Sequence, residues 1–113
     1  VVQWPEGNRA ISAGTASQIT DMMVTVVEEG TAVNAAVPGY RVAAKTGTAQ
    51  QVLPGGGYSS THFLCSVIGF APAERPQVLV YVGLNGIPYL ASESAAPLFG
   101  RIMAEALTDS GVI

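Results

Sequence analysis

The tetrapeptide Lys45-Thr46-Gly47-Thr48 holds the residues of this chain that are best suited to chemistry. Lys45 supplies a cation, and the two threonines supply hydroxyls two residues apart, which lie on one face of a strand. Glycine inside a strand often marks the close approach of a ligand or of another backbone. The tetrapeptide therefore predicts an exposed edge strand that holds an anion and an acyl group.

The sequence around the tetrapeptide makes the signal more specific. K-T-G is one of three motifs of serine acyltransferases, together with S-x-x-K and S-x-N, but three common residues also occur by chance. Its flanks are VVEEGTAVNAAVPGYRVAAKTGTAQ and, further on, FLCSVIGFAPAERPQVLVYVGLN. From about Ile11 to about Leu107 the chain resembles the C-terminal part of the transpeptidase domain of class B penicillin-binding proteins. Within that group it is most similar to the D,D-transpeptidases of cell division and elongation.

The resemblance implies a role for each residue of the motif. Lys45 would lie beside the serine of S-x-N, where it would lend positive potential and organise proton transfer. The hydroxyls of Thr46 and Thr48 would bind the terminal carboxylate of the donor peptide or of a β-lactam. The backbone N–H of Thr48 would form half of the oxyanion hole.

Three further positions complete the expected substrate-binding strand: Gly47, Ala49 and Gln50. Gly47 would let the substrate lie against the strand as an extra extended partner. Gln50 is explained equally well by simple loop polarity. Lys45 also has a plain alternative, because lysine on an edge strand is a common protection against aggregation.

The other two motifs of the family are missing from the chain. No serine is followed three residues later by lysine or two residues later by asparagine, and Lys45 is the only lysine. The nucleophile, its base and the S-x-N loop are therefore expected upstream of Val1. On this view residues 1–113 are the C-terminal fragment of one transpeptidase domain, its first partner is the N-terminal portion of the same protein, and the fragment alone is inactive.

The resemblance also implies partners and a location. The parent protein would cross-link peptidoglycan stem peptides through a serine acyl-enzyme, would be acylated by β-lactam antibiotics, and would work with divisome or elongasome proteins. It would act at the extracytoplasmic face of the bacterial membrane, with its anchor outside this chain. No cofactor is implied.

Composition excludes two classes of ligand. The net charge is −3 and the five basic residues are scattered, so no phosphate-binding surface for nucleic acid is expected. One histidine and one cysteine cannot provide the usual ligand count of a metal site. Cys65, in the apolar segment FLCSVIGF, is expected to be a buried thiol.

The pattern of elements predicts an α+β fold. A helix is expected from the N-cap Ser12 to about Glu29, stopped by Gly30. Three strands follow at residues 41–50, 61–71 and 77–84, joined by short connections that favour antiparallel pairing. A C-terminal helix covers about residues 94–107. The resemblance places this helix–meander–helix unit in the five-stranded sheet of a penicillin-binding, serine β-lactamase-like fold.

The hydrophobic pattern predicts the core and an exposed remainder. Two strands are apolar on both faces, and charged residues make up only 12% of the chain, about half the usual share. Two helices cannot cover such a sheet, so the isolated chain is expected to expose apolar surface. The residues expected to be buried on the helices are Ile19, Met22, Met23, Val26 and Val27 on the first, and Leu98, Ile102, Phe99, Met103 and Ala106 on the second.

Two other functions remain open at this point. The first is a serine β-lactamase or carboxypeptidase of the same fold, although the continuation G-T-A-Q after K-T-G is closer to the transpeptidases. The second is a non-catalytic β-lactam sensor domain, which would keep the acylation site. The three alternatives share one fold, and fold alone does not decide between them.

Overall fold

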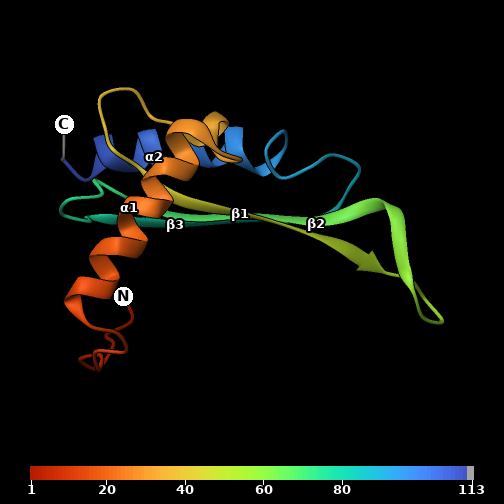
Figure 1. Cartoon of the computed structure of the whole chain (residues 1–113), viewed down its shortest axis with the longest axis horizontal. Coiled ribbons are helices and arrows are strands. Elements are labelled where there is room, and N and C mark those ends of the chain that lie inside the picture. Colours follow the sequence, from red (N-terminus) through yellow and green to blue (C-terminus); the bar gives the residue numbers. More distant parts are fainter. Residues whose placement is uncertain (112–113) are drawn as a thin grey trace.

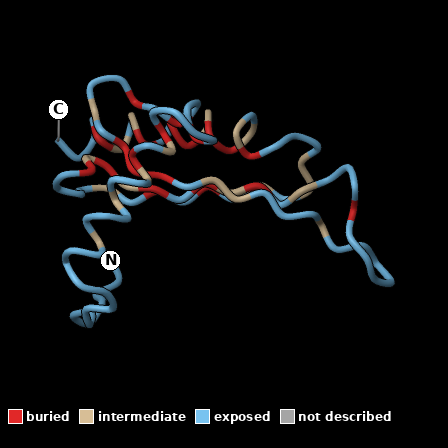
Figure 2. Tube along the Cα trace, viewed as in Figure 1, coloured by how far each residue is buried: buried red, intermediate tan, exposed pale blue. Residues whose placement is uncertain are grey.

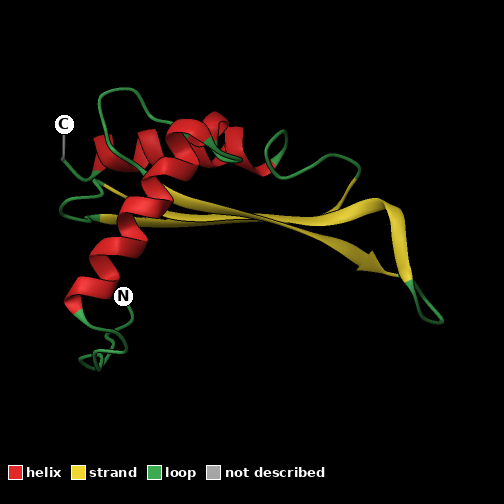
Figure 3. Ribbon diagram, in the orientation of Figure 1, coloured by secondary structure: helices red, strands yellow, loops and turns green. Residues whose placement is uncertain are grey.

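The computed structural model describes residues 1–111 and has the expected order of elements (Figure 1, Figure 3). Two helices flank a meander of three strands, with a short 3-10 helix before the first strand. This is the predicted α+β arrangement. In chain order the elements are α1 (Ala13–Glu29), η1 (Val33–Ala35), β1 (Ala43–Val52), β2 (Tyr58–Ala71), β3 (Val78–Ile87) and α2 (Ala95–Asp109).

The three strands form one antiparallel sheet in the order β1-β2-β3, so β1, which carries the tetrapeptide, is an edge strand. Thr48 of β1 lies opposite Cys65 of β2, and Lys45 lies opposite Ile68. The long β1–β2 hairpin projects beyond the helices (Figure 1). Its turn, residues 55–57, is three glycines with φ of 88°, 108° and 78°, a region in which residues with a side chain are strained.

The main core lies between α2 and one face of the sheet (Figure 2). Phe99, Met103 and Leu107 follow one another at four-residue intervals along α2 and are fully buried. Gly69 of β2 permits this close packing. A Cβ at Gly69 would lie 2.8 Å from Cζ of Phe99 and 2.6 Å from the carbonyl oxygen of Ala43.

The ends of α1 are as predicted, and its buried stripe is predicted correctly only in the C-terminal half, where Val27 is buried and Met23 and Val26 are partly buried. Ser12 caps the helix by accepting a hydrogen bond from the backbone N–H of Thr15 at 3.1 Å. The fully buried residues are Val24 and Val27, and the two predicted core residues Ile19 and Met22 are 42% and 62% exposed. The reason is visible in Figure 1: only the C-terminal part of α1 crosses the sheet, and the rest extends away from it.

The predicted stripe of α2 is wrong at one position. Ile102 is exposed, and Gly100 is buried instead. A Cβ at Gly100 would lie 3.2 Å from the carbonyl oxygen of Ala35, so glycine lets η1 approach the helix.

The strand bounds differ from those that the hydrophobic pattern predicted: β2 and β3 are longer, and β1 has the predicted length but is shifted by two residues. β1 begins two residues later than expected and continues to Val52, β2 begins at Tyr58, and β3 ends at Ile87. Backbone pairing does not require apolar side chains, so the ladder continues into the polar hairpin.

The expected exposed apolar surface is present on the face of the sheet opposite α2. α1 covers one end of this face, where Val24 packs against Ala43 and Ala73. Beyond that contact, four large apolar side chains remain exposed: Leu64, Ile68, Leu79 and Tyr81. A monomeric soluble domain rarely leaves such a cluster uncovered.

Candidate functional site

The open edge of β1 is the surface that the tetrapeptide offers. In an edge strand, alternate residues direct their N–H and C=O groups toward the neighbouring strand and toward the open side. Just before β1, the carbonyl oxygen of Arg41 accepts a hydrogen bond at 2.8 Å from the N–H of Ala73, two residues after the end of β2. The carbonyl oxygen of Thr46 instead accepts from Nζ of Lys45 at 2.7 Å. By this alternation, the backbone groups of Thr46 and Thr48 face the open edge.

The two threonine side chains lie on the same face of β1, as predicted. They share the face of Cys65 and Val67, which are their cross-strand neighbours and belong to the α2-side core. Oγ1 of Thr48 accepts a hydrogen bond from the backbone N–H of Ala91 at 3.2 Å. The Thr48 hydroxyl keeps its single proton, which it can donate to an anion.

Lys45 lies on the opposite face, next to exposed Ile68, and its side chain bends back to the edge. Its ammonium group contacts the carbonyl oxygen of Thr46 at 2.7 Å and reaches Oγ1 of the same residue at 3.5 Å. The ion pair found within residues 1–111 is Arg41–Glu74, so Lys45 has no carboxylate partner in this part of the chain. Its positive charge is thus placed at the open edge beside Thr46.

A loop from the other end of the chain supports the site. Sγ of Cys65 donates to the carbonyl oxygen of Tyr89 at 3.1 Å, and Thr48 holds Ala91 two residues further on. Cys65 and Thr48 are a cross-strand pair, so the loop between β3 and α2 is fixed at two points over one position of the sheet. Sequence reasoning missed Tyr89 and Ala91, because neither carries a motif and both are bound through backbone atoms.

The packing of β1 on β2 gives a reason for glycine at position 47, in addition to the expected approach of the substrate. A Cβ at this position would lie 2.8 Å from Oγ of Ser66, its cross-strand neighbour. That contact would have to be relieved by a movement of the serine side chain. Glycine at this position avoids that contact.

The remaining predicted positions are less closely organised. Ala49 and Gln50 continue β1 and are exposed, with no side-chain hydrogen bond from Gln50 to another residue in the described part of the chain. The neighbouring Gln51 is the one that is bound, because its Nε2 donates to Oδ1 of Asn85 at 3.3 Å. The structure therefore gives Lys45, Thr46 and Thr48 a common site and leaves Gln50 beside it.

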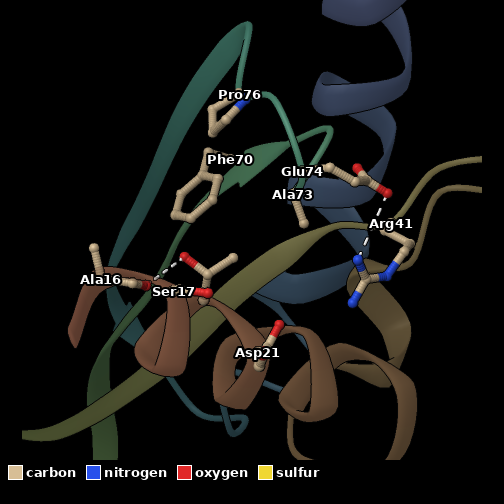
Figure 4. A pocket seen from close by; sticks show the side chains of 9 residues that line it. Ala16, Ser17, Asp21, Arg41, Phe70, Ala73, Glu74 and Pro76 are labelled. Carbon is tan, nitrogen blue, oxygen red and sulfur yellow. Dashed lines mark hydrogen bonds and ion pairs between the residues drawn. The ribbon is translucent and has the colours of Figure 1, made fainter. Parts of the chain in front are cut away.

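A separate pocket of about 300 Å³ lies between α1 and the turn that follows β2 (Figure 4). Phe70 of β2 and residues Ser17 and Asp21 of α1 line it, and the Arg41–Glu74 ion pair, at 3.6 Å, closes one side. Both partners of this pair are about half exposed. None of the tetrapeptide residues lines this pocket, so it is not part of the candidate site.

No helix within residues 1–111 is both long enough and apolar enough to cross a membrane. No cluster of three or more histidine, cysteine, aspartate or glutamate side chains that could hold a metal ion occurs there.

Comparison with known proteins connects this geometry to a family. The model of the penicillin binding protein transpeptidase domain matches residues 2–104. The chain is 44% identical over 107 residues to stage V sporulation protein D of Bacillus subtilis, covering 92% of this chain and 16% of the relative. It is 40% identical to the probable peptidoglycan D,D-transpeptidase PenA of Neisseria flavescens, covering 96% of this chain and 28% of the relative.

A solved structure agrees with these relatives. Penicillin-binding protein 3 of Mycobacterium tuberculosis, complexed with ampicillin, superposes with a TM-score of 0.83 at 33% identity, covering 98% of this chain and 28% of that one. The chain therefore belongs to the penicillin-binding protein transpeptidase domain family, and its relatives are class B members, as the resemblance predicted. It spans 16% and 28% of the length of the two curated relatives named above.

Proposed function

We propose that this chain is the substrate-holding part of a serine-type peptidoglycan D,D-transpeptidase. One observation carries the proposal: on the edge strand β1, the Lys45 ammonium group contacts Thr46, and the hydroxyls of Thr46 and Thr48 lie on one face. A substrate with a carboxylate and a scissile carbonyl can lie along this edge as an additional strand. Membership of the transpeptidase family and the name of the Neisseria relative support the same reaction.

Within this proposal, the side chains bind the negative end of the donor. The hydroxyls of Thr46 and Thr48 donate hydrogen bonds to the terminal carboxylate of a stem peptide or to the equivalent carboxylate of a β-lactam. Charge-assisted hydrogen bonds of this kind are about twice as strong as neutral ones. Lys45, on the other face of the strand, raises the positive potential and organises proton transfer beside the reacting serine.

The backbone of β1 stabilises the transition state. Acyl transfer places negative charge on the former carbonyl oxygen, and the outward N–H of Thr48 is in position to receive it. Because the strand is held by its ladder, this donor needs no rearrangement during the reaction. Loss of one such donor typically raises the barrier by about 3 kcal/mol.

The remaining machinery is proposed to lie in the rest of the parent protein. It would supply the nucleophilic serine, its base and the S-x-N serine, together with the strands and helices that cover Leu79 and Tyr81 on the exposed face of the sheet. On this proposal, residues 1–113 alone form no acyl-enzyme. The parent would act at the extracytoplasmic face of the membrane, and divisome or elongasome proteins would be its partners.

Intact mass spectrometry of the full-length parent, with and without benzylpenicillin, tests this proposal. We expect the protein to gain the mass of the drug, and peptide mapping should locate the adduct on a serine outside this segment. The adduct should persist, because a transpeptidase releases the penicilloyl group slowly. A parent protein that is not acylated, or an adduct inside residues 1–113, would contradict the proposal.

The lifetime of the adduct and a second substrate separate the alternatives. Rapid release of the penicilloyl group would indicate a β-lactamase. A stable penicilloyl adduct would indicate a sensor if the protein also fails to turn over a D-alanyl-D-alanine stem peptide, whether or not an acceptor amine is present. Transfer to the acceptor amine is the outcome that the proposal expects.

A further inference from the structure

Thr31 contacts the motif from outside it. Its hydroxyl oxygen lies 2.6 Å from that of Thr46, although 15 positions separate the two residues in the sequence. Thr31 follows α1 directly, after the cap residue Gly30. The end of this helix is thus joined to the middle of the candidate site by one hydrogen bond.

The backbone on either side of Thr31 fixes its position. The N–H groups of Gly30 and Ala32 both donate to the carbonyl oxygen of Val26, at 3.0 and 3.1 Å. Ala32 is completely buried. A Cβ at Gly30 would lie 3.0 Å from the same carbonyl oxygen, so glycine suits this tight closure. Thr31 therefore presents its hydroxyl from a turn that two backbone hydrogen bonds hold.

The hydrogen-bonding capacity of Thr46 indicates what this contact does. A threonine hydroxyl donates one hydrogen bond and accepts two. Lys45, whose ammonium group can only donate, lies 3.5 Å from Oγ1 of Thr46. Either hydroxyl can donate in the Thr31–Thr46 hydrogen bond. In the arrangement in which Thr31 donates, Oγ1 of Thr46 accepts from Thr31 and faces the Lys45 ammonium group, and the proton of Thr46 is left to donate outward. Hydroxyls linked in this way polarise one another, which strengthens the last donor of the chain.

We propose that Thr31 is a positioning residue that turns the Thr46 hydroxyl toward the substrate carboxylate and strengthens its donation. The inference rests on the proposed function, in which Thr46 contacts that carboxylate. Thr31 itself does not touch the substrate. A purely structural link between α1 and β1 would instead depend on the shape of the side chain and not on its hydroxyl group.

The test compares variants of the full-length parent by their second-order rate of acylation by benzylpenicillin. We expect Thr31→Val, which keeps the shape of the side chain, to lower this rate about three- to tenfold. Thr31→Ser, which keeps the hydroxyl, should restore most of it. Thr25→Val is the matched control, because the Thr25 hydroxyl donates to the carbonyl oxygen of Asp21 within α1, and we expect it to leave the rate unchanged.

A double variant shows whether Thr31 acts through Thr46. When Thr46→Val is already present, the addition of Thr31→Val should lower the rate no further. A full additional loss, or an equal loss in Thr31→Ser and Thr31→Val, would overturn the positioning role. So would a Thr31→Val protein that is acylated at the wild-type rate. If the wild-type protein is not acylated at all, the proposed function fails, and this result is distinct from the other three.

Discussion

Oγ1 of Thr48 accepts a hydrogen bond from the backbone N–H of Ala91, at 3.2 Å, and this bond ties the edge strand to the loop before α2. A second bond, from Cys65 to Tyr89, holds the same loop on the neighbouring strand. The site is therefore built by three segments that are far apart in the sequence. Its threonine is oriented by a protein donor before any ligand binds, which lowers the cost of ordering it on binding.

Substitutions at Thr48 should show whether its hydroxyl group or its methyl group is required for acylation. We expect Thr48→Val to lower the acylation rate of the parent by about tenfold or more, because a hydrogen bond to a charged group is lost. Thr48→Ser keeps the hydroxyl and should stay within about threefold of the wild type. Stopped-flow acylation by a fluorescent penicillin measures both rates. Equal losses in the two variants would show that the methyl group, and not the hydroxyl, is required.

Gly69 should be the least replaceable glycine of the sheet. A Cβ there would lie within 3 Å of the backbone of Ala43 and of the ring of Phe99, and overpacking of a core typically costs about 1–3 kcal/mol. We expect Gly69→Ala to lower the free energy of unfolding of the domain by at least that amount, as measured by chemical denaturation.

Gly14→Ala is the matched control for this substitution. Gly14 lies in the first turn of α1, and a Cβ there would meet nothing within 4 Å. Since alanine is the better helix former, the free energy of unfolding should rise by up to about 1 kcal/mol. A Gly69→Ala protein as stable as the wild type would contradict the described packing of α2 on the sheet.

Cys65 should control the order of the loop before α2. Cys65→Ala removes the hydrogen bond to the Tyr89 carbonyl and leaves a small cavity, with an expected loss of about 1–2 kcal/mol. The amide of Ala91 should then exchange its hydrogen faster than in the wild type. The amides in the middle of β2 should become less protected only by the amount that the lower global stability explains. Hydrogen exchange followed by mass spectrometry measures both regions. Unchanged exchange at residues 88–94 would show that the thiol does not hold this loop.

The order of elements could be predicted from the sequence because the signals were local. Ser12 and Gly30 mark the ends of α1 by their own side-chain and backbone chemistry. The buried stripes were predicted less well, because they depend on where a helix touches the sheet. Gly69 lets α2 approach the sheet and Gly100 lets η1 approach α2, and no periodicity within the helix reveals either contact.

In the candidate site, too, some residues could be predicted from the sequence and others could not. Lys45, Thr46 and Thr48 were predicted from their types and spacing, and they lie on the edge strand of the sheet; their roles stay predictions. Tyr89 and Ala91 bind through backbone atoms, which have no sequence signature, and Thr31 contacts the site only because the turn after α1 closes on Val26. Such supporting residues become visible only when the fold brings them to the motif.

Comparison of benzylpenicillin with its methyl ester tests the central claim most directly, because the ester lacks the carboxylate that Thr46 and Thr48 are proposed to bind. The second-order acylation rate of the full-length parent would be measured for both compounds in the wild type and in Thr46→Val. We predict that the substitution slows acylation by benzylpenicillin about tenfold or more and has little effect with the ester. An equal loss with both compounds would contradict carboxylate binding at the edge of β1.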